Sequence, residues 1–343
     1  MSDLFFDYDL PEHLVAQEPA HPRDAARLLV ARRDTGTLEH RVFHDLPDLL
    51  RPGDLIVLND TKVLPARVIG RRAKTGGKWE GLFLHENPSG EWELLAQTRG
   101  FPEVGETLIV EPGELKLVLT GRTTDRHWLV RPDPPGTPAD LLARHGQVPL
   151  PPYIRKGRAR TDDQARYQTV YAAHTGSVAA PTAGLHFTPE LFERLTATGI
   201  RTARVTLHVG LGTFAPVKTQ DPTAHPIHAE WCEVGPETVA AVVETRARGG
   251  RVVAVGTTTT RTLESAARGG TLVPWRGDTS LFIRPPFNFQ VLGGLVTNFH
   301  LPKTTLLLLA QAFAGTDLLR AAYREAVARE YRFYSYGDAM VIL

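Results

Sequence analysis

A run of small residues that ends in a histidine is the part of this chain best suited to binding chemistry. Residues 177–186 read Ser-Val-Ala-Ala-Pro-Thr-Ala-Gly-Leu-His, with hydroxyls at Ser177 and Thr182, a glycine at Gly184 and an imidazole at His186. A loop with so little bulk lets a ligand approach the backbone closely, where N–H groups can bind it. The segment therefore predicts a ligand-binding loop. An ordinary tight turn is the alternative.

A second loop of small residues follows a strand-like segment, residues 202–209, that contains His208. Gly210 and Gly212 begin a Gly-x-Gly-x-x-Ala pattern, but Pro216 comes directly after it. No helix is then ready to receive a pyrophosphate, so the pattern does not indicate a dinucleotide site. The helix-start signal Thr188-Pro189-Glu190 lies between this loop and the first one. Two small-residue loops around one predicted helix favour a bound small molecule.

A third loop joins a buried strand, residues 251–255, to a helix through Gly256, Thr257 and Thr258. Free N–H groups, threonine hydroxyls and the helix dipole converge on anions at such a junction. The Gly-Lys-Ser/Thr ending of a Walker loop is absent. Arg261 could bind a carboxylate or phosphate, and Glu264 could accept from a ribose hydroxyl. A capped helix with a surface arginine explains the spacing equally well.

Two further polar side chains, Asn298 and His300, lie where a predicted strand ends and a helix begins. Ligands of α/β sheets bind at the carboxyl ends of strands. A lone histidine in apolar surroundings is, by itself, more often a hydrogen-bonded core residue.

Four potential metal ligands crowd together at His225, His228, Glu230 and Cys232. Their spacing matches no zinc signature, so we predict a structural or substrate-facing loop and no metal site. Cys232 is the single cysteine, which excludes a disulfide within the chain.

Basic residues cluster locally, although the net charge of +1 predicts no global field for nucleic acid. Arg155, Lys156, Arg158 and Arg160 form the densest run, which could contact phosphates. Arginines and tyrosines also gather in residues 320–332, where solvated helix faces are the stronger explanation.

Length and composition favour a large two-domain protein without a membrane partner. The chain has 343 residues, and its longest apolar runs are too short to cross a bilayer. Its acidic N-terminal residues do not resemble a signal peptide, so we expect a cytosolic protein. Short strand-like runs with turn residues fill residues 66–130 and predict a small β-barrel or sandwich. From residue 201 onward, strands and helices alternate, with helices expected at residues 236–248 and 304–314, which predicts an α/β body.

Long motifs along the whole chain resemble the S-adenosylmethionine:tRNA ribosyltransferase-isomerase family of queuosine biosynthesis. The three loops above carry part of the resemblance, together with Thr-Asn-Phe-His-Leu-Pro at residues 297–302. The other motifs are Phe-Asp-Tyr-Asp-Leu-Pro at 6–11, Gln-Glu-Pro at 17–19, Pro-Arg-Asp at 22–24, Leu-Asn-Asp-Thr-Lys-Val at 58–63, Pro-Ala-Arg at 65–67, Pro-Pro-Tyr-Ile at 151–154, Arg-Tyr-Gln-Thr-Val-Tyr at 166–171 and Tyr-Gly-Asp-Ala-Met at 336–340.

The resemblance implies a fold and a reaction. It implies an α/β, barrel-like body, residues 1–65 and 148–343, with an all-β barrel inserted at residues 66–147. It implies transfer of the ribosyl part of S-adenosylmethionine to the 7-aminomethyl-7-deazaguanine wobble base of tRNA, with isomerisation to an epoxycyclopentane and loss of adenine and methionine. S-adenosylmethionine is then a substrate, and no separate cofactor is expected.

The resemblance also ranks the site residues. The reaction needs a base near C5′, an acid for adenine and a group that keeps the attacking amine neutral. His186, His208, His300, Glu264 and Asp338 lie in family motifs as catalytic candidates, and their roles stay unassigned. The substrate-binding candidates are Ser177, Thr182, Gly184, Gly210, Gly212, Gly256, Thr257, Thr258, Arg261 and Asn298. The tRNA-binding candidates are Arg155, Lys156, Arg158 and Arg160.

The chain departs from the family at two positions near the Asn-Phe-His motif. Gly293 stands where an acidic residue is usual, and Thr304 replaces a serine but keeps its hydroxyl. Two other functions stay open: a nucleotide-binding enzyme acting on small molecules, and a non-catalytic RNA-binding protein. The small-molecule loops argue against the second.

Overall fold

The computed structural model describes residues 7–210 and 227–343, and these divide into two compact units. One unit, the body, comprises residues 1–62, 153–156 and 168–343. The other, the barrel unit, comprises residues 63–152 and 157–167. The all-β insertion expected at residues 66–147 thus lies inside the barrel unit, which begins at residue 63 and also includes residues 148–152 and 157–167.

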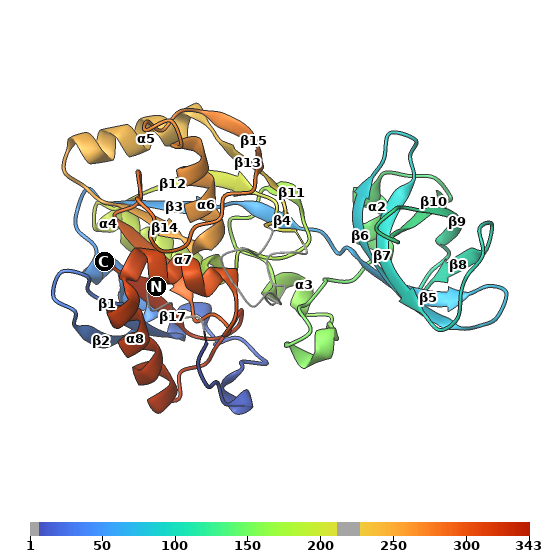
Figure 1. Ribbon diagram of the computed structural model, residues 1–343, viewed down its shortest axis with the longest axis horizontal. Coiled ribbons are helices and arrows are strands. Elements are labelled where there is room, and N and C mark those ends of the chain that lie inside the picture. Colours follow the sequence, from blue (N-terminus) through green and yellow to red (C-terminus); the bar gives the residue numbers. More distant parts are fainter. Residues whose placement is uncertain (1–6, 211–226) are drawn as a thin grey trace. The chain divides into compact units, whose positions relative to one another are not determined.

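The body is built on one nine-stranded mixed sheet (Figure 1). Its strand order is β15-β13-β12-β3-β14-β16-β17-β1-β2, so β15 and β2 form its two edges. The strands are β1 (Arg27–Ala31), β2 (Leu38–Val42), β3 (Leu55–Asn59), β12 (Arg201–Leu207), β13 (Glu230–Val234), β14 (Val252–Val255), β15 (Trp275–Thr279), β16 (Gly294–Asn298) and β17 (Ala339–Ile342). Strands β12, β3, β14 and β16 run parallel, so their carboxyl ends meet at one edge.

Helices cover both faces of this sheet, as an α/β architecture requires. Leu55 and Val57 of β3 pack into the core beneath α5 to α8, whereas Ile56 and Leu58 pack into the core beneath α1 and α4. The body helices are α1 (Leu46–Leu49), α4 (Pro189–Ala197), α5 (Pro236–Ala247), α6 (Gly256–Ala266), α7 (Thr305–Ala314) and α8 (Thr316–Ala328). The predicted α/β body is confirmed, including the helices expected near residues 236–248 and 304–314. Its sheet is open at β15 and β2, so the barrel-like form that the resemblance implies is not found in the described residues of the body.

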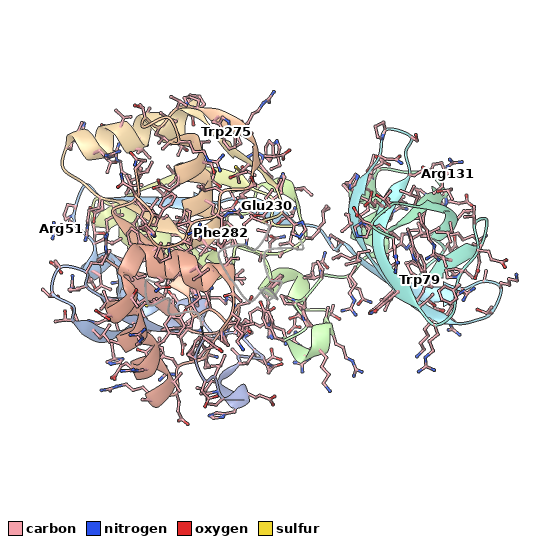
Figure 2. All side chains as sticks on the ribbon, viewed as in Figure 1. Arg51, Trp79, Arg131, Glu230, Trp275 and Phe282 are labelled. Atoms are coloured by element: carbon pink, nitrogen blue, oxygen red, sulfur yellow. The ribbon has the colours of Figure 1, made fainter. Side chains whose placement is uncertain are left out.

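The barrel unit contains a closed antiparallel barrel of order β10-β7-β6-β5-β8-β9. Its strands are β5 (Arg67–Arg72), β6 (Lys78–Glu86), β7 (Trp92–Thr98), β8 (Thr107–Val110), β9 (Lys116–Arg122) and β10 (Trp128–Asp133). Inward and outward residues alternate, as in Lys78, Trp79 and Glu80, of which only Trp79 is buried (Figure 2). Helices α2 (Pro138–His145) and α3 (Asp163–Arg166) belong to the same unit. The predicted all-β barrel is confirmed.

Two short elements complete the edge of the body where the candidate loops gather. Strands β4 (Thr61–Val63) and β11 (His174–Ser177) form a separate two-stranded sheet. The 3-10 helix η5 (Thr182–His186) follows β11 and contacts β16. The small-residue loop of residues 177–186 is therefore held against the carboxyl end of a central strand.

Candidate active site

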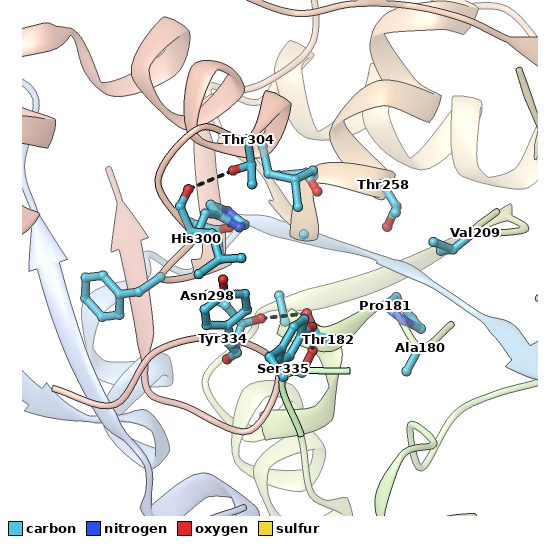
Figure 3. A pocket seen from close by; sticks show the side chains of 18 residues that line it. Ala180, Pro181, Thr182, Val209, Thr258, Asn298, His300, Thr304, Tyr334 and Ser335 are labelled. Carbon is cyan, nitrogen blue, oxygen red and sulfur yellow. Dashed lines mark hydrogen bonds between the residues drawn. The ribbon is translucent and has the colours of Figure 1, made fainter. Parts of the chain in front are cut away.

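A hollow in the body lies where β14 and β16 end (Figure 3). Residues from two of the predicted ligand loops, 177–186 and 256–258, meet there with the Asn-Phe-His motif, and Val209 lies next to the start of the other loop. Its cavity volume is about 50 Å³. The described residues that line it are Tyr153, Ala180, Pro181, Thr182, Ala183, Val209, Gly256, Thr257, Thr258, Thr297, Asn298, Phe299, His300, Leu301, Thr304, Leu306, Tyr334 and Ser335. None of these side chains is an acid, a lysine or an arginine, so the described lining is polar but uncharged.

The start of α6 forms one wall of this hollow. Gly256 adopts φ +88°, a left-handed conformation that glycine tolerates better than other residues, and it turns the chain from β14 directly into the helix. The first N–H groups of a helix lack partners within it, and the helix dipole makes this end positive. Thr258 is held by the Asn59 side-chain amide, whose Nδ2 lies 3.2 Å from the threonine Oγ1. The sequence-predicted anion-binding junction therefore lines the hollow.

Asn298 lies at the centre of the hydrogen bonds below the hollow. Its Oδ1 accepts from the Thr182 hydroxyl at 3.0 Å, a bond drawn in Figure 3. Its Nδ2 donates to the Tyr334 carbonyl at 3.1 Å and lies 3.3 Å from the His186 Nε2. Both ends of the amide are engaged, so Asn298 joins η5, β16 and the chain before β17.

His300 is the one catalytic candidate that lines the hollow in the described part of the chain. Its Nε2 lies 2.7 Å from the Thr297 hydroxyl, and its backbone N–H donates to the Tyr323 hydroxyl at 2.9 Å. Burial lowers the pKa of His300 to about 3. The imidazole is therefore neutral at physiological pH, with one unprotonated ring nitrogen.

His186 lies behind the hollow and does not line it. Its ring stacks on Phe43 with centroids 4.8 Å apart. Burial, and then the nearby Arg23 charge, lower the pKa of His186 to about 3. The neutral His186 ring turns an acceptor nitrogen toward the Asn298 side-chain amide, and this contact holds the amide in place.

His208 belongs to a different cluster, at the ends of β12 and β4. Its Nδ1 lies 2.8 Å from the Thr61 hydroxyl, and its ring stacks on Trp231 at 5.1 Å. Burial lowers the pKa of His208, and nearby His174 lowers it further. The structure thus separates His208 from the described lining that contains His300.

Arg261 does not face the hollow, in contrast to the sequence-based expectation that it binds a carboxylate. Its NH1 forms a buried ion pair with Glu230, which Figure 2 labels. The remaining guanidinium groups donate to the carbonyls of Leu281 (3.0 Å) and Thr279 (3.2 Å). The carboxylate that Arg261 binds within the chain is Glu230 of β13, 31 residues away in the sequence, and binding of a substrate carboxylate stays a prediction.

Glu264 and Asp338 also have intramolecular partners. The Glu264 carboxylate accepts the N–H groups of Gln290, Val291 and Leu292 at 2.8–3.2 Å. Burial raises the pKa of this carboxyl, and the amide donors oppose that change. Asp338 accepts from the backbone N–H groups of Arg27 and Arg332 and pairs with both guanidinium groups. These contacts give both carboxylates a positioning role.

Three residues from the binding candidates shape the backbone around the hollow. Ser177 donates to the Ala179 carbonyl at 2.6 Å and accepts from the Val209 N–H at 2.9 Å. A Cβ on Gly184 would lie 1.9 Å from the Tyr171 hydroxyl, which explains why this position is glycine. Gly210 donates its N–H to Glu230 at 2.9 Å. Gly212 and His225 lie outside the described residues.

The predicted basic run divides between the two units. The Arg155 side chain is only 12% exposed and forms an ion pair with Glu18 at 2.8 Å, which ties it to the body. Lys156 also belongs to the body, whereas Arg158 and Arg160 belong to the barrel unit. Arg155 is therefore poorly placed for a phosphate.

Sequence reasoning missed three residues of the lining: Tyr153, Tyr334 and Ser335. The two tyrosine rings lie 4.1 Å apart, and the Tyr153 hydroxyl lies 2.7 Å from the Ser335 Oγ. Tyr334 adopts φ +72°, a strained backbone often found at functional sites. Tyr153 lies within the motif at 151–154, and Tyr334 and Ser335 directly precede the motif at 336–340, but only the fold brings them together.

Comparisons with known proteins agree with this arrangement of motifs. The family model described as "Queuosine biosynthesis protein" matches residues 4–342. The chain belongs to this family. The family membership predicted from the sequence is thereby confirmed.

Relatives match the chain over nearly its full length. Proteins named S-adenosylmethionine:tRNA ribosyltransferase-isomerase from Symbiobacterium thermophilum and Anaeromyxobacter sp. are 51% and 53% identical to it. Each comparison covers 98% of this chain, and 98% and 97% of the relative. The crystal structure of S-adenosylmethionine tRNA ribosyltransferase from Thermotoga maritima is similar with a TM-score of 0.57 at 40% identity, over 98% of this chain and 99% of that one.

Two further classes of feature were sought in residues 7–210 and 227–343. No group of three or more histidine, cysteine, aspartate or glutamate side chains there could hold a metal ion. Every helix in these ranges falls short of the length and apolar character that a membrane crossing requires.

Proposed function

We propose that this chain is an S-adenosylmethionine:tRNA ribosyltransferase-isomerase of queuosine biosynthesis. It transfers the ribosyl part of S-adenosylmethionine to tRNA and isomerises it. The acceptor is the 7-aminomethyl-7-deazaguanine at the wobble position, and adenine and methionine leave. The observation that carries the proposal is the uncharged hollow at the carboxyl ends of β14 and β16, in a chain that matches its relatives from end to end.

The uncharged lining suits the sulfonium of S-adenosylmethionine, because the positive charge of the sulfonium must make the proton on the neighbouring C5′ acidic. A carboxylate beside the sulfonium would neutralise its field and weaken that acidity. The described lining offers hydroxyls, an amide and a neutral imidazole instead. The substrate's own positive charge then stabilises the carbanion that forms when the C5′ proton leaves.

Three parts of the hollow fit three parts of S-adenosylmethionine. The start of α6, with Gly256 and Thr257, suits the methionyl carboxylate. The paired rings of Tyr153 and Tyr334 offer a face for adenine. His300 is the side chain that would accept or return a proton. The substrate is larger than the cavity of about 50 Å³, so it extends beyond these residues.

Release of adenine tests the proposed function. The purified protein should release adenine from S-adenosylmethionine only when tRNA carrying 7-aminomethyl-7-deazaguanine is present, and not with tRNA that has guanine at that position. Adenine release without tRNA would indicate an enzyme acting on small molecules. Binding of tRNA without adenine release would indicate an RNA-binding protein.

Substitution of His300 tests its role in the same assay. His300→Gln keeps a polar side chain beside Thr297 but cannot carry the proton, so the rate at saturating substrates should fall by roughly 10²- to 10⁴-fold. The Michaelis constant for S-adenosylmethionine should change much less. An unchanged rate would remove His300 from the reaction. We also propose that no metal or other cofactor is needed, so dialysis against a chelator should leave the rate unchanged.

A further inference from the structure

The barrel unit has a groove of its own, with a cavity volume of about 800 Å³. Outward-facing residues of β5, β6 and β7 form its floor, and residues 157–159 form one side. Every residue that lines it belongs to the barrel unit. The groove is therefore formed by residues of the barrel unit alone.

Positive side chains dominate the charges of this groove. Arg67, Lys78, Arg99 and Arg158 line it, against the carboxylates of Glu80 and Glu111. The pairing of the strands brings these charges together. Lys78 of β6 lies opposite Arg71 of β5. The next residue, Trp79, pairs with Thr98 of β7, and Arg99 follows Thr98 in the chain. Alternation along β6 turns Trp79 inward and leaves Lys78 exposed.

Both carboxylates of the groove already have arginine partners. Glu80 pairs with Arg67, which lowers the pKa of this carboxyl, and it also accepts from Gln97. Glu111 pairs with Arg71 at 2.7 Å. The side chains of Lys78 and Arg99 make no ion pair or hydrogen bond within residues 7–210 and 227–343. Two uncompensated positive charges therefore lie in one open groove.

Phe101, two positions after Arg99 in the sequence, carries an exposed aromatic ring. Phe101 is 90% exposed, although a large apolar side chain gains free energy by burial. The Arg122 guanidinium donates to the Pro102 carbonyl at 3.3 Å, which ties this part of the loop to β9. Proteins bind unpaired RNA strands by placing cationic side chains along the RNA backbone and an aromatic side chain beside them.

We propose that this groove binds the sugar–phosphate backbone of the tRNA substrate, with Lys78 and Arg99 on phosphates and Phe101 stacked on an unpaired base. The proposal rests on the proposed function, because it assumes that tRNA is the substrate. The contacts are electrostatic and carry no sequence information, so they position the RNA and do not select the wobble base.

The salt dependence of tRNA binding tests the phosphate contacts. Lys78→Ala/Arg99→Ala should lower the slope of log K against log salt by about 1.4 to 1.8, at 0.7 to 0.9 for each lost contact. Half-saturation of adenine release by tRNA should move to a higher tRNA concentration. The double variant should keep the thermal stability of the original protein, since neither side chain has a partner to lose.

A matched control removes the same charge from the opposite side of the barrel. Lys116 begins β9, which is three strands from β6 in the closed order, and Arg126 lies in the turn after β9. Both are exposed and form no ion pair in the described part of the chain. Lys116→Ala/Arg126→Ala should leave the slope nearly unchanged. Equal slopes for the two double variants would overturn the groove as the binding surface.

Phe101 is tested separately from charge. Phe101→Ala should weaken tRNA binding roughly 5- to 100-fold without changing the salt slope, and Phe101→Tyr should restore binding. Equal binding by all three proteins would overturn the stacking contact. If adenosine monophosphate binds to the original protein but not to Lys78→Ala/Arg99→Ala, and the tRNA slope is unchanged, the groove is a nucleotide site and the proposal fails.

The two proposals fail in different ways. If the original protein releases no adenine with modified tRNA, the proposed function is wrong whatever the slopes are. If adenine is released but Lys78→Ala/Arg99→Ala binds tRNA with an unchanged slope, only the groove proposal is wrong.

Discussion

Arg261 shows how a residue in a recognisable motif can have a structural role. Its ion pair with Glu230 joins α6 to β13, and its other donors hold the chain after β15. Glu230 also accepts the N–H of Gly210 at the end of β12. The Arg261–Glu230 ion pair therefore links α6, β13, the end of β15 and the residues that follow β12.

Loss of Arg261 should destabilise the fold. Arg261→Ala leaves the buried Glu230 carboxylate without its partner, which costs about 3–5 kcal/mol of unfolding free energy in comparable pairs. Chemical denaturation measures this loss. The double variant Arg261→Met/Glu230→Gln should recover most of it, because no unpaired charge remains. A stable Arg261→Ala protein with weakened S-adenosylmethionine binding would instead support the original sequence-based role.

His186 should make stability depend on pH. Burial lowers its pKa from 6.5 to about 3 in the folded protein. As the pH falls below 6.5, the unfolded chain binds a proton that the folded protein does not, so stability is lost toward acid. At pH 5 the loss from this residue should be about 2 kcal/mol relative to pH 7.5. Denaturation at both pH values should show a smaller difference for His186→Gln, and equal differences would contradict the low pKa.

For individual residues, the sequence predicted the place in the fold better than the chemical role. Asn298, His300, Thr182 and Gly256 were singled out and do line one hollow. The partners that decide what Arg261 or Glu264 does lie far away in the chain, and spacing along a sequence does not show such contacts. Tyr334 was missed because its left-handed backbone leaves no mark on its residue type.

The 3-10 helix η5 packs closely against Tyr171 at Gly184. A Cβ on Gly184 would lie 1.9 Å from the Tyr171 hydroxyl and 3.0 Å from the ring carbon that bears it. That hydroxyl makes no hydrogen bond within the described part of the chain. The Tyr171 ring in turn lies 4.5 Å from the Arg204 guanidinium carbon. Little room remains for the ring to move.

Gly184→Ala should therefore destabilise the protein by about 1–3 kcal/mol. Tyr171→Phe alone should cost little, because the hydroxyl it removes has no partner to lose. Combining the two should recover part of the loss, since the closest contact disappears. Thermal unfolding of the three variants measures the coupling. Strict additivity of the two changes would show that this contact does not explain the glycine.

Periodicity predicted most elements because their patterns are local. The six barrel strands and the helices near residues 236–248 and 304–314 follow from alternation, turn residues and helix-end signals. The pairing of strands did not follow, because β1 lies beside β17 and β3 beside both β12 and β14. Such contacts join residues hundreds of positions apart and depend on the packed core.

For the whole molecule, the division into two units has a consequence for stability. The barrel unit has its own buried ion pair, in which Arg72 binds Glu106 through two bonds of 2.6 and 2.7 Å. Neither residue takes part in the core of the body. Damage to this pair should therefore remain within one unit.

Arg72→Ala should lower the stability of the barrel unit by roughly 2–4 kcal/mol. The side chains of Arg72 and Glu106 are only 9% and 4% exposed, so the Glu106 carboxylate would be left almost fully buried without a partner. Hydrogen exchange should become faster in residues 63–152 and stay unchanged in β14, β16 and α6. The variant Arg72→Met/Glu106→Gln should restore slow exchange. Faster exchange throughout the chain would show that the two units unfold together.

The order of strands in the body's sheet also has a consequence for synthesis of the chain on the ribosome. Strand β1, residues 27–31, is made early, but its parallel neighbour β17 comprises residues 339–342. The barrel strands lie wholly between residues 67 and 133, so the barrel can close while much of the body is still unmade. Until residue 342 has emerged, β1 exposes a hydrogen-bonding edge that an aggregating chain could capture. A premature stop codon at Ala339 would make that exposure permanent, so the truncated product should be sent to chaperones and proteases.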